Sequence, residues 1–372
     1  MYLQSLNLYN FRNYSNISTQ FSPRLNILLG DNAQGKTNLL ESIYFLALAR
    51  SHRVNNDKNL IRWGHDLCKI KGNVFSTVDK SSLNLEIVIN KKGKKASVNS
   101  IEQPKLSQYI GNFNVILFSP EDLSLIKGSS HIRRRFIDRE YSQINLKYLY
   151  ISLEYKNVLK QRNKYLKQLQ SHKAKDLIYL DVLSDQLSIL GSKIITARLL
   201  FISNLQKWAE LIYNQISQRK EKLIIKYLTQ IKINKNISFE NQLKNLYLKY
   251  RDKEIERGMT LIGPHRDDIS FLLNNNDVHI YGSQGQQRTI VLSIKLAEVY
   301  YMYEQIHEYP VLLLDDVLSE LDLNRQKYLL NMIKNKAQTF LTTPSLSEIL
   351  KKNIINSNII HISQGSLLGG RK

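Results

Sequence analysis

Eight consecutive residues near the amino terminus form a pattern suited to binding phosphate groups. They run Gly30-Asp31-Asn32-Ala33-Gln34-Gly35-Lys36-Thr37. Glycine lets the backbone turn so that amide hydrogens converge on phosphate oxygens, the lysine reaches the outer phosphates, and the threonine hydroxyl ligates Mg²⁺. The apolar residues 25–29 precede this loop and a helical pattern over residues 37–50 follows it. Strand, loop and helix in this order are the context that the motif requires, so the sequence predicts an ATP-binding loop.

Two carboxylates that could complete such a site lie near the other end of the chain. The apolar run Val311 to Leu314 ends in Asp315 and Asp316, as expected of a central strand whose carboxyl end meets a ligand. We expect Asp315 to hold Mg²⁺ through its water shell and Asp316 to orient or deprotonate the attacking water. The alternative, a strand that simply ends in solvent, is weakened by the phosphate-binding loop.

A third candidate is the segment Tyr281 to Thr289, which begins a helix with small residues and hydrogen-bond donors. The start of a helix readily receives a phosphate because its amide hydrogens are unpaired. Such a start is weak evidence alone, but its place shortly before the Asp pair makes Ser283 a candidate phosphate contact.

The composition limits the class of protein. With 53 Lys+Arg against 32 Asp+Glu the formal net charge is +21, which favours polyanionic partners such as nucleic acid. A lysine-rich composition from an AT-rich genome is the alternative source of part of this charge. The single Cys68 excludes an internal disulfide framework. We expect no secretory signal, no apolar run near the ~20 residues of a membrane span, and a cytoplasmic protein.

Proline placement and periodicity predict a split fold. Residues 83–98 alternate as in a hairpin, and no proline lies between Pro120 and Pro264, so this middle range is expected to be almost entirely helical. Apolar residues at helical spacing over 151–169 and 180–201 predict an antiparallel helical hairpin, an arm of ~27 residues or roughly 40 Å. The alternative is a small bundle of core helices.

After Pro264 strand and helix patterns alternate, as in a parallel α/β sheet. Strands are expected at residues 269–273, 278–281, 311–314 and 339–341, with a helix at 285–307. The predicted fold is thus an α/β head with a mixed sheet, split by a mostly helical arm. The expected ranges are 1–130 for the first half of the head, 131–257 for the arm and 258–372 for the second half.

These motifs together resemble the ABC-type ATPase heads, including those of SMC proteins, and within that group the RecF family of bacterial recombination and gap-repair proteins. The residues that carry the resemblance are Asn10 to Tyr14, Gly30 to Asn38, Phe118 to Leu123, Arg133 to Phe136, Gly263 to Asp268, Leu314 to Val317 and Ser319 to Asp322. They span the chain from beginning to end.

The resemblance implies an ATP- and Mg²⁺-dependent homodimer that binds double-stranded or gapped DNA and acts with RecR and RecO to help load RecA. It implies that Ser283 contacts the γ-phosphate held by the other subunit and that Arg12, Asn13 and Asn38 approach the nucleotide of their own. Asp322 would lie at the dimer interface.

Three departures from the wider ABC pattern bear on chemistry. Asp316 replaces the usual glutamate and reaches water less well, so we expect slow turnover. Thr342-Thr343-Pro344 stands where many heads carry a histidine, and Thr343 is our candidate γ-phosphate sensor. The segment Phe118 to Asp122 lacks the glutamine of most ABC heads.

No base-reading motif is recognisable, so DNA binding should act through phosphates and depend on salt. The candidate contacts are Arg133, Arg134 and Arg135, the hairpin lysines Lys91, Lys92, Lys94 and Lys95, and the arm residues Lys160, Arg162, Lys164 and Lys167. Any one of these clusters could instead be a solvated face.

Two other functions share parts of this pattern. The ATPase subunit of a membrane transporter has the same head, but a membrane partner explains neither the basic helical insertion nor the sequence Ser283 to Arg288 in place of Leu-Ser-Gly-Gly-Gln. A small-molecule kinase would need neither the Ser-Gly helix start nor the segment Ser319 to Asp322.

Overall fold

The computed structural model describes residues 1–218, 221–233, 237–334, 336–346 and 357–368, which form two compact units. One unit, here called the head, comprises Met1–Asp122 and Ile294–Lys372; the other, here called the arm, comprises Leu123–Ser293. Helix α10 (Gln284–Ile306) contributes residues to both. The head is therefore built from both ends of the chain. The range 131–257 expected for the arm lies within the second unit.

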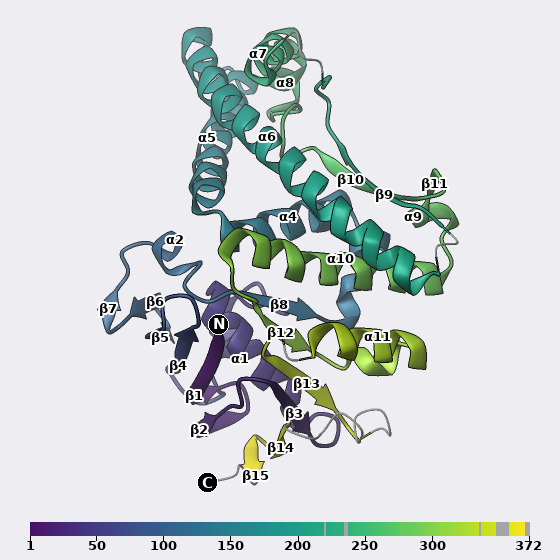
Figure 1. Ribbon diagram of the computed structural model, residues 1–372. Coiled ribbons are helices and arrows are strands. Elements are labelled where there is room, and N and C mark those ends of the chain that lie inside the picture. The colour runs from purple at the N-terminus through teal and green to yellow at the C-terminus, as the bar shows by residue number, and fades with distance from the viewer. Residues whose placement is uncertain (219–220, 234–236, 335, 347–356, 369–372) are drawn as a thin grey trace. The chain divides into compact units, whose positions relative to one another are not determined.

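The first sheet of the head carries the loops of interest. Its order is β15-β14-β3-β13-β12-β8, and its strands pair in parallel except β15. The strands are β3 (Leu25–Leu29), β8 (Val115–Phe118), β12 (Val311–Leu314), β13 (Thr339–Thr343), β14 (Asn358–Ser363) and β15 (Ser366–Leu368). Strand β3, purple in Figure 1, lies between β13 and β14, which come from the yellow end of the chain. The predicted strands at 25–29, 311–314 and 339–341 are confirmed.

The second sheet of the head is antiparallel, in the order β2-β1-β4-β5-β6-β7. Its strands are β1 (Tyr2–Phe11), β2 (Tyr14–Gln20), β4 (Leu67–Ser76), β5 (Ser81–Asn90), β6 (Gly93–Val98) and β7 (Ile101–Glu102). Alternate residues of β4 and β5 are buried and join a core with helix α1 (Lys36–Leu48). The predicted hairpin at 83–98 is confirmed. The other short helices are η1 (Asp57–Leu60), α2 (Leu106–Tyr109), η2 (Pro120–Leu123), η3 (Val317–Glu320) and α11 (Leu323–Ile333).

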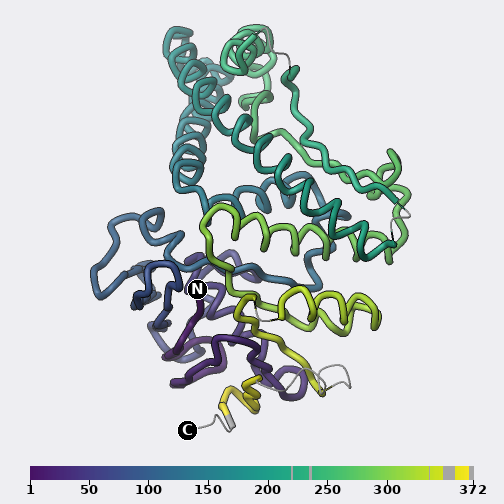
Figure 2. Tube along the Cα trace, in the orientation of Figure 1, coloured from purple at the N-terminus to yellow at the C-terminus, as the bar shows by residue number. Residues whose placement is uncertain are grey.

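The arm is mostly helical. Its helices are α3 (Ser124–Lys127), α4 (Ser130–Ile144), α5 (Leu146–Gln170), α6 (Leu177–Ile216), α7 (Phe239–Lys249), α8 (Arg251–Arg257) and α9 (Val278–Tyr281). Helices α5 and α6 form the predicted hairpin, with Leu166, Leu169 and Leu180 packed near its turn. The chain can be followed through both helices in Figure 2. Helix α6 has 40 residues, or roughly 60 Å at 1.5 Å per residue, and exceeds the predicted length.

Two local predictions are wrong. Residues 278–281 form helix α9 and no strand, because the Asp277 side chain accepts a hydrogen bond from the His279 amide (2.8 Å) and caps a helical turn. The range expected to be helical also contains β9 (Leu223–Leu228), which pairs with β10 (Asp268–Leu273), itself paired with β11 (Asn276–Asp277).

Helix α6 is long and apolar enough to cross a membrane by length and composition alone, which departs from the expectation that no run approaches this limit. Half of its most apolar window is buried. Its buried residues include Leu183, Leu187 and Ile194, which belong to the predicted apolar seam. Core helices of this length pass the same test, so the observation favours packing within the arm.

Candidate nucleotide-binding site

The predicted phosphate-binding loop connects β3 to α1, as the sequence requires. Gly35 immediately precedes α1 with a φ of 117°, in the left-handed region that favours glycine. A Cβ atom at Gly35 would lie 2.6 Å from Asn13 Nδ2, and one at Gly30 would lie 2.2 Å from the Ile362 carbonyl oxygen. A side chain at either position would clash with its neighbours, and the backbone conformation of Gly35 also favours glycine.

Two turns of the head support the loop from behind. From the turn after β1, Asn13 Nδ2 donates to the Gln34 carbonyl (3.2 Å) and the Tyr14 hydroxyl donates to the Gly35 carbonyl (2.9 Å). From the turn between β14 and β15, the Gly365 amide donates to the same Gln34 carbonyl (3.0 Å). These bonds hold the carbonyls of Gln34 and Gly35 in place without a ligand.

The loop has an exposed part and a buried part. Asp31, Asn32 and Ala33 are exposed, whereas Lys36 is buried. The Lys36 ammonium donates to the carbonyls of Gly30 (2.5 Å) and Asp31 (2.7 Å). Burial lowers the pKa of Lys36, and the carboxylates of Asp316, Asp31 and Asp315 oppose that shift. The cation thus lies among acceptors at the loop, where a phosphate oxygen could replace the carbonyls.

The distant carboxylates meet the loop at the carboxyl ends of the parallel strands. Thr37 Oγ1 donates to Asp315 Oδ1 at 3.0 Å, although the two residues lie at opposite ends of the chain. Thr342 Oγ1, on the intervening strand β13, donates to the same oxygen at 3.0 Å. Burial raises the pKa of Asp315, and the hydrogen bonds from Thr342 and Thr37 oppose that rise. Thr37 and Asp315, both predicted to hold Mg²⁺, thus lie within hydrogen-bonding distance of each other.

The chemistry of this pair suits Mg²⁺. It offers one hydroxyl and one carboxylate oxygen, the hard donors that this ion prefers, usually together with substrate phosphates and water. Among the described residues no group of three His, Cys, Asp or Glu side chains forms a self-contained metal site.

Asp316 and the neighbouring residues Thr342 and Thr343 make different contacts at the ends of β12 and β13. Asp316 has a φ of 52°, its side chain is exposed, and its amide donates to Thr342 Oγ1 (2.8 Å). Thr343, the predicted sensor, instead donates its hydroxyl to the Ser345 carbonyl (2.7 Å). Thr342 is thus the threonine that touches both acidic residues, and sequence reasoning missed it. The alternation of side chains along β13 separates the two neighbours.

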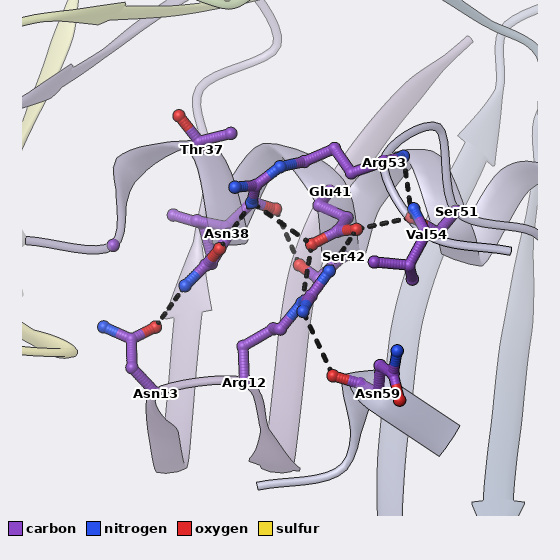
Figure 3. Close-up of polar contacts among 12 residues, drawn as sticks. Arg12, Asn13, Thr37, Asn38, Glu41, Ser42, Ser51, Arg53, Val54 and Asn59 are labelled. Atoms are coloured by element: carbon purple, nitrogen blue, oxygen red, sulfur yellow. Dashed lines mark hydrogen bonds and ion pairs between the residues drawn. The ribbon is translucent and has the colours of Figure 1, made fainter. Parts of the chain in front are cut away.

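Arg12 is engaged by a buried carboxylate beside the loop, as Figure 3 shows. Its guanidinium makes two 2.9 Å bonds to Glu41 and a 3.1 Å bond to the Asn59 carbonyl. Ser51 also donates to Glu41 (2.5 Å). Burial alone would raise the pKa of Glu41, but the bonds from Arg12 and Ser51 outweigh it and lower the pKa. Arg12 therefore anchors the turn beside the loop, a role the sequence did not reveal.

The two amides expected near the nucleotide are also linked. Asn38 Nδ2 donates to Asn13 Oδ1 (2.8 Å), and Arg53 donates to Asn38 Oδ1 (2.9 Å), both drawn in Figure 3. Asn13 thereby joins the loop to the first turn of α1. Arg53, which was not predicted, brings an exposed guanidinium to this cluster.

Ser283 lies in the arm, at the start of α10, and its side chain is exposed. Its hydroxyl accepts a hydrogen bond from the Gln286 amide (3.2 Å), as in the first turn of a capped helix. The predicted helix at 285–307 is confirmed. An exposed serine at a helix start is available to a ligand held elsewhere.

Three of the arginines predicted to contact DNA are occupied inside the arm. Arg133 makes two bonds to Asp268 (2.6 and 2.8 Å), and Arg134 donates to the Asp267 carbonyl (2.6 Å). Arg162 is 1% exposed and pairs with Glu254 at 2.7 Å. The prediction for Arg162 is wrong, because a buried side chain does not reach a duplex. Arg135 is exposed.

The remaining candidate lysines differ in what they contact. Lys94 pairs with Asp57 (2.6 Å), and Lys91 and Lys95 pair with exposed carboxylates of Asp66 and Glu102. The side chains of Lys92, and of Lys160, Lys164 and Lys167 on α5, are exposed. The three lysines of α5 recur at helical spacing and form one basic face, here called the α5 lysine face.

Comparison with known proteins places this site in a family. The model of the RecF/RecN/SMC N-terminal domain matches residues 2–364. The chain is 52% identical over 372 residues to the DNA replication and repair protein RecF of Latilactobacillus sakei, covering 99% of each. It is 49% identical to the RecF of Bacillus velezensis, over 99% of this chain and 100% of that protein.

Solved structures agree. The structure of the recombination mediator protein RecF with ATP, in the RecFOR pathway, matches with a TM-score of 0.91 at 33% identity, covering 99% of this chain and 98% of that one. An SMC head bound to the C-terminal winged-helix domain of ScpA matches with a TM-score of 0.57 at 13% identity, over 99% and 96% of the two chains, and shows a shared fold. The predicted ABC-type head is confirmed.

Proposed function

Because the chain belongs to the RecF family, we propose that it is an ATP-dependent DNA-binding protein of recombinational repair and replication-fork maintenance. Two chains would sandwich two ATP molecules, each held by the loop of one chain and by Ser283 of the other. The dimer would bind duplex DNA or a gap junction and, with RecR and RecO, help to load RecA. ATP would serve mainly as a switch for dimerisation.

The observation that carries this proposal is the 3.0 Å bond between Thr37 and Asp315. It brings the loop after β3 and the acid after β12 to one place, and Lys36 lies in the same loop. With Mg–ATP bound, the metal would neutralise phosphate charge. Thr37 and Asp315 would hold it, Lys36 would bind the outer phosphates, and the amides of residues 30–36 would surround the inner ones.

Slow hydrolysis follows from the acid that faces solvent. Asp316 is exposed and would orient or deprotonate water at the γ-phosphate. Its carboxylate is one methylene shorter than the glutamate of transporters and reaches a given water less well. At such a site ATP stays bound for a long time before it is hydrolysed, which suits a switch.

Solution mass in the presence of ATP tests the dimer. We expect Lys36→Met and Ser283→Arg to remain monomeric, because the first loses the phosphate cation and the second blocks the trans contact. Asp316→Asn should bind ATP without cleaving it and accumulate dimer. Lys105→Met, at an exposed site of the head, is the matched control and should dimerise like the wild type. Dimerisation of Lys36→Met would refute the proposal.

Salt titration of duplex binding tests the DNA surface. Each phosphate contact adds roughly 0.9 to the slope of log affinity against log salt. We expect Lys160→Gln/Lys164→Gln/Lys167→Gln to lower that slope by about 2 to 3 in the presence of ATP. The control, Lys58→Gln/Lys80→Gln/Lys105→Gln, removes the same charge from exposed sites of the head. Equal slopes for the two triple variants would contradict a role for the α5 lysine face.

A further inference from the structure

The helix start that carries Ser283 is held by a reciprocal pair of hydrogen bonds. Ser283 Oγ accepts from the Gln286 amide (3.2 Å), and Gln286 Oε1 accepts from the Ser283 amide (2.8 Å). This arrangement is a capping box, in which each side chain satisfies an unpaired backbone amide of the other residue. The Ser283 hydroxyl is therefore oriented by Gln286. The side-chain amide of Gln286 uses its oxygen in this capping box, and its nitrogen makes a different contact.

The side-chain nitrogen of Gln286 contacts a carboxylate between the end of α6 and the start of β9. Gln286 Nε2 donates to Glu221 Oε1 at 2.5 Å, and Glu221 Oε2 accepts from the Tyr213 hydroxyl at 2.5 Å. Tyr213 lies in the last turn of α6 and is buried, and Glu221 shortly precedes β9. One carboxylate thus joins the end of the longest helix to the start of α10.

The chemistry of this carboxylate decides how the Gln286 amide is turned. A side-chain amide has an accepting oxygen and a donating nitrogen, whereas an ionised carboxylate only accepts. Because Glu221 accepts at both oxygens, it selects the nitrogen of Gln286 and leaves the oxygen for the Ser283 amide. Without Glu221 either orientation could face Ser283, and one of the two breaks the capping box.

Space beside this contact would let the amide move. A cavity of about 130 Å³ is lined by Glu221 and Gln286 together with Asn274, Asp277, Val278 and Tyr281. A side chain that is fully enclosed keeps its rotamer when one bond is lost, but a side chain at a cavity wall has other positions to occupy. Glu221 therefore matters more here than it would in a packed core.

We propose that Glu221 is a positioning residue for Ser283, acting through Gln286, and that it couples the start of α10 to α6 and β9 of the arm. The inference rests on the proposed function, because the trans contact of Ser283 gives the coupling its purpose. Displacement of β9 or of the end of α6 would release Gln286 and misorient the Ser283 hydroxyl. Events on the arm would in this way change how tightly ATP joins two chains.

An exchange of the two side chains tests the coupling. Gln286→Glu sets two carboxylates against each other, and Glu221→Ala removes the acceptor. In the double variant Glu221→Gln/Gln286→Glu, the introduced amide can accept from Tyr213 and donate to the introduced carboxylate, which still accepts from the Ser283 amide. We expect roughly tenfold weaker ATP-driven dimerisation for Glu221→Ala, a greater loss for Gln286→Glu, and recovery to within about threefold of the wild type for the exchange.

Two further readouts separate coupling from misfolding and from failure of the dimer model. Binding of a fluorescent ATP analogue to dilute monomer should be unchanged in Glu221→Ala, and hydrogen exchange at the Ser283 amide should accelerate without ATP. Wild-type dimerisation by Glu221→Ala, or an exchange variant as weak as Gln286→Glu, would overturn the inference alone. A wild-type protein that stays monomeric with ATP would overturn the proposed function and the inference together.

Discussion

The phosphate-binding loop of the head and the buried polar cluster of the arm use polar groups in opposite ways. In the loop, Asp31 and Asn32 are exposed, and so is Asp316, which follows β12 near the loop. In the arm, Arg198 donates to the Tyr148 hydroxyl (3.0 Å), the Pro264 carbonyl (2.7 Å) and Asp138 (2.8 Å). The loop keeps capacity for a ligand, whereas Arg198 uses its donors within its own chain.

The arm cluster also separates two carboxylates by their surroundings. Burial alone would raise the pKa of Asp138, but Arg198 and Lys156 outweigh it and lower the pKa to about 2. Burial also raises the pKa of Asp267, and there it prevails over the hydrogen bond from Tyr227 and the charge of Arg198, so the pKa is about 6. The carboxylate with the lower pKa is thus the one that pairs directly with a guanidinium, at 2.8 Å from Arg198. Polar side chains that bond within the arm thus contribute to stability, whereas the exposed polar groups at the loop remain available for function.

Removing the cation should produce the largest effect. Arg198→Met leaves the partly buried Asp138 with the Tyr148 hydroxyl and Lys156 as its side-chain partners. It also removes the donor to the Pro264 carbonyl, so we expect the free energy of unfolding to fall by about 3 to 5 kcal/mol. Denaturant titration measures this loss. Arg257→Met, at an exposed site on α8, should change it by less than about 0.5 kcal/mol. Similar changes in the free energy of unfolding for the two variants would show that the buried cluster contributes no more stability than an exposed arginine.

A smaller, pH-dependent effect should come from Asp267. Its pKa in the folded chain is about 6, above the ordinary value of 3.8, so proton binding favours the folded state. The associated stability is fully present below pH 3.8 and is lost as pH rises through about 6. Relative to Asp267→Asn, the wild type should therefore gain up to about 3 kcal/mol between about pH 8 and pH 4.

Paired urea titrations across that pH range measure the Asp267 effect, and other titrating groups cancel in the difference. The asparagine can still accept from the Tyr227 hydroxyl, so packing is matched. A difference that stays constant with pH would show that Asp267 keeps an ordinary pKa.

The smallest effect should separate the neighbouring threonines of the head. Thr342→Val removes the hydroxyl that bonds Asp315 and the Asp316 amide, and we expect about tenfold slower ATP hydrolysis, or ~1.4 kcal/mol in the barrier. Thr343→Val only removes a bond to Ser345 and should change the rate by less than about threefold. Single-turnover hydrolysis compares them. The reverse order would restore Thr343 as the sensor that the sequence suggested.

The sequence predicted the loop and its carboxylates because their chemistry is local. A strand, a glycine loop and a helix start are contiguous, and Val311 to Leu314 ends directly in its acids. Their meeting was predictable because carboxyl ends of parallel strands share one edge of a sheet. The helical hairpin of the arm followed from its periodicity. The domain ranges and the roles of the site residues remain predictions.

Three of the contacts that sequence reasoning missed are formed between distant segments. Arg162 was predicted to contact DNA, and nothing near it in the sequence signals its partner Glu254. The nucleotide contact of Arg12 was predicted from the family resemblance, which does not reveal its ion pair with Glu41 on α1. Strand β9 was hidden because its partner β10 lies beyond the intervening helices. The turn at α9 depended on a single cap by Asp277. Tertiary pairing decided the first three of these cases over local pattern, whereas the α9 turn was decided by a local cap.

The enclosure of β3 between β13 and β14 has a consequence for how the protein is made. A ribosome that has finished residue 29 must continue past residue 339 before β3 can find a neighbour, which takes roughly 15 to 60 s at about 5 to 20 residues per second. During that time β3 has unpaired edges, and the arm (Leu123–Ser293) is completed before β13 is made. Nascent chains stalled before β13 should therefore carry a folded arm and an unfinished head, and should depend on chaperones to escape aggregation.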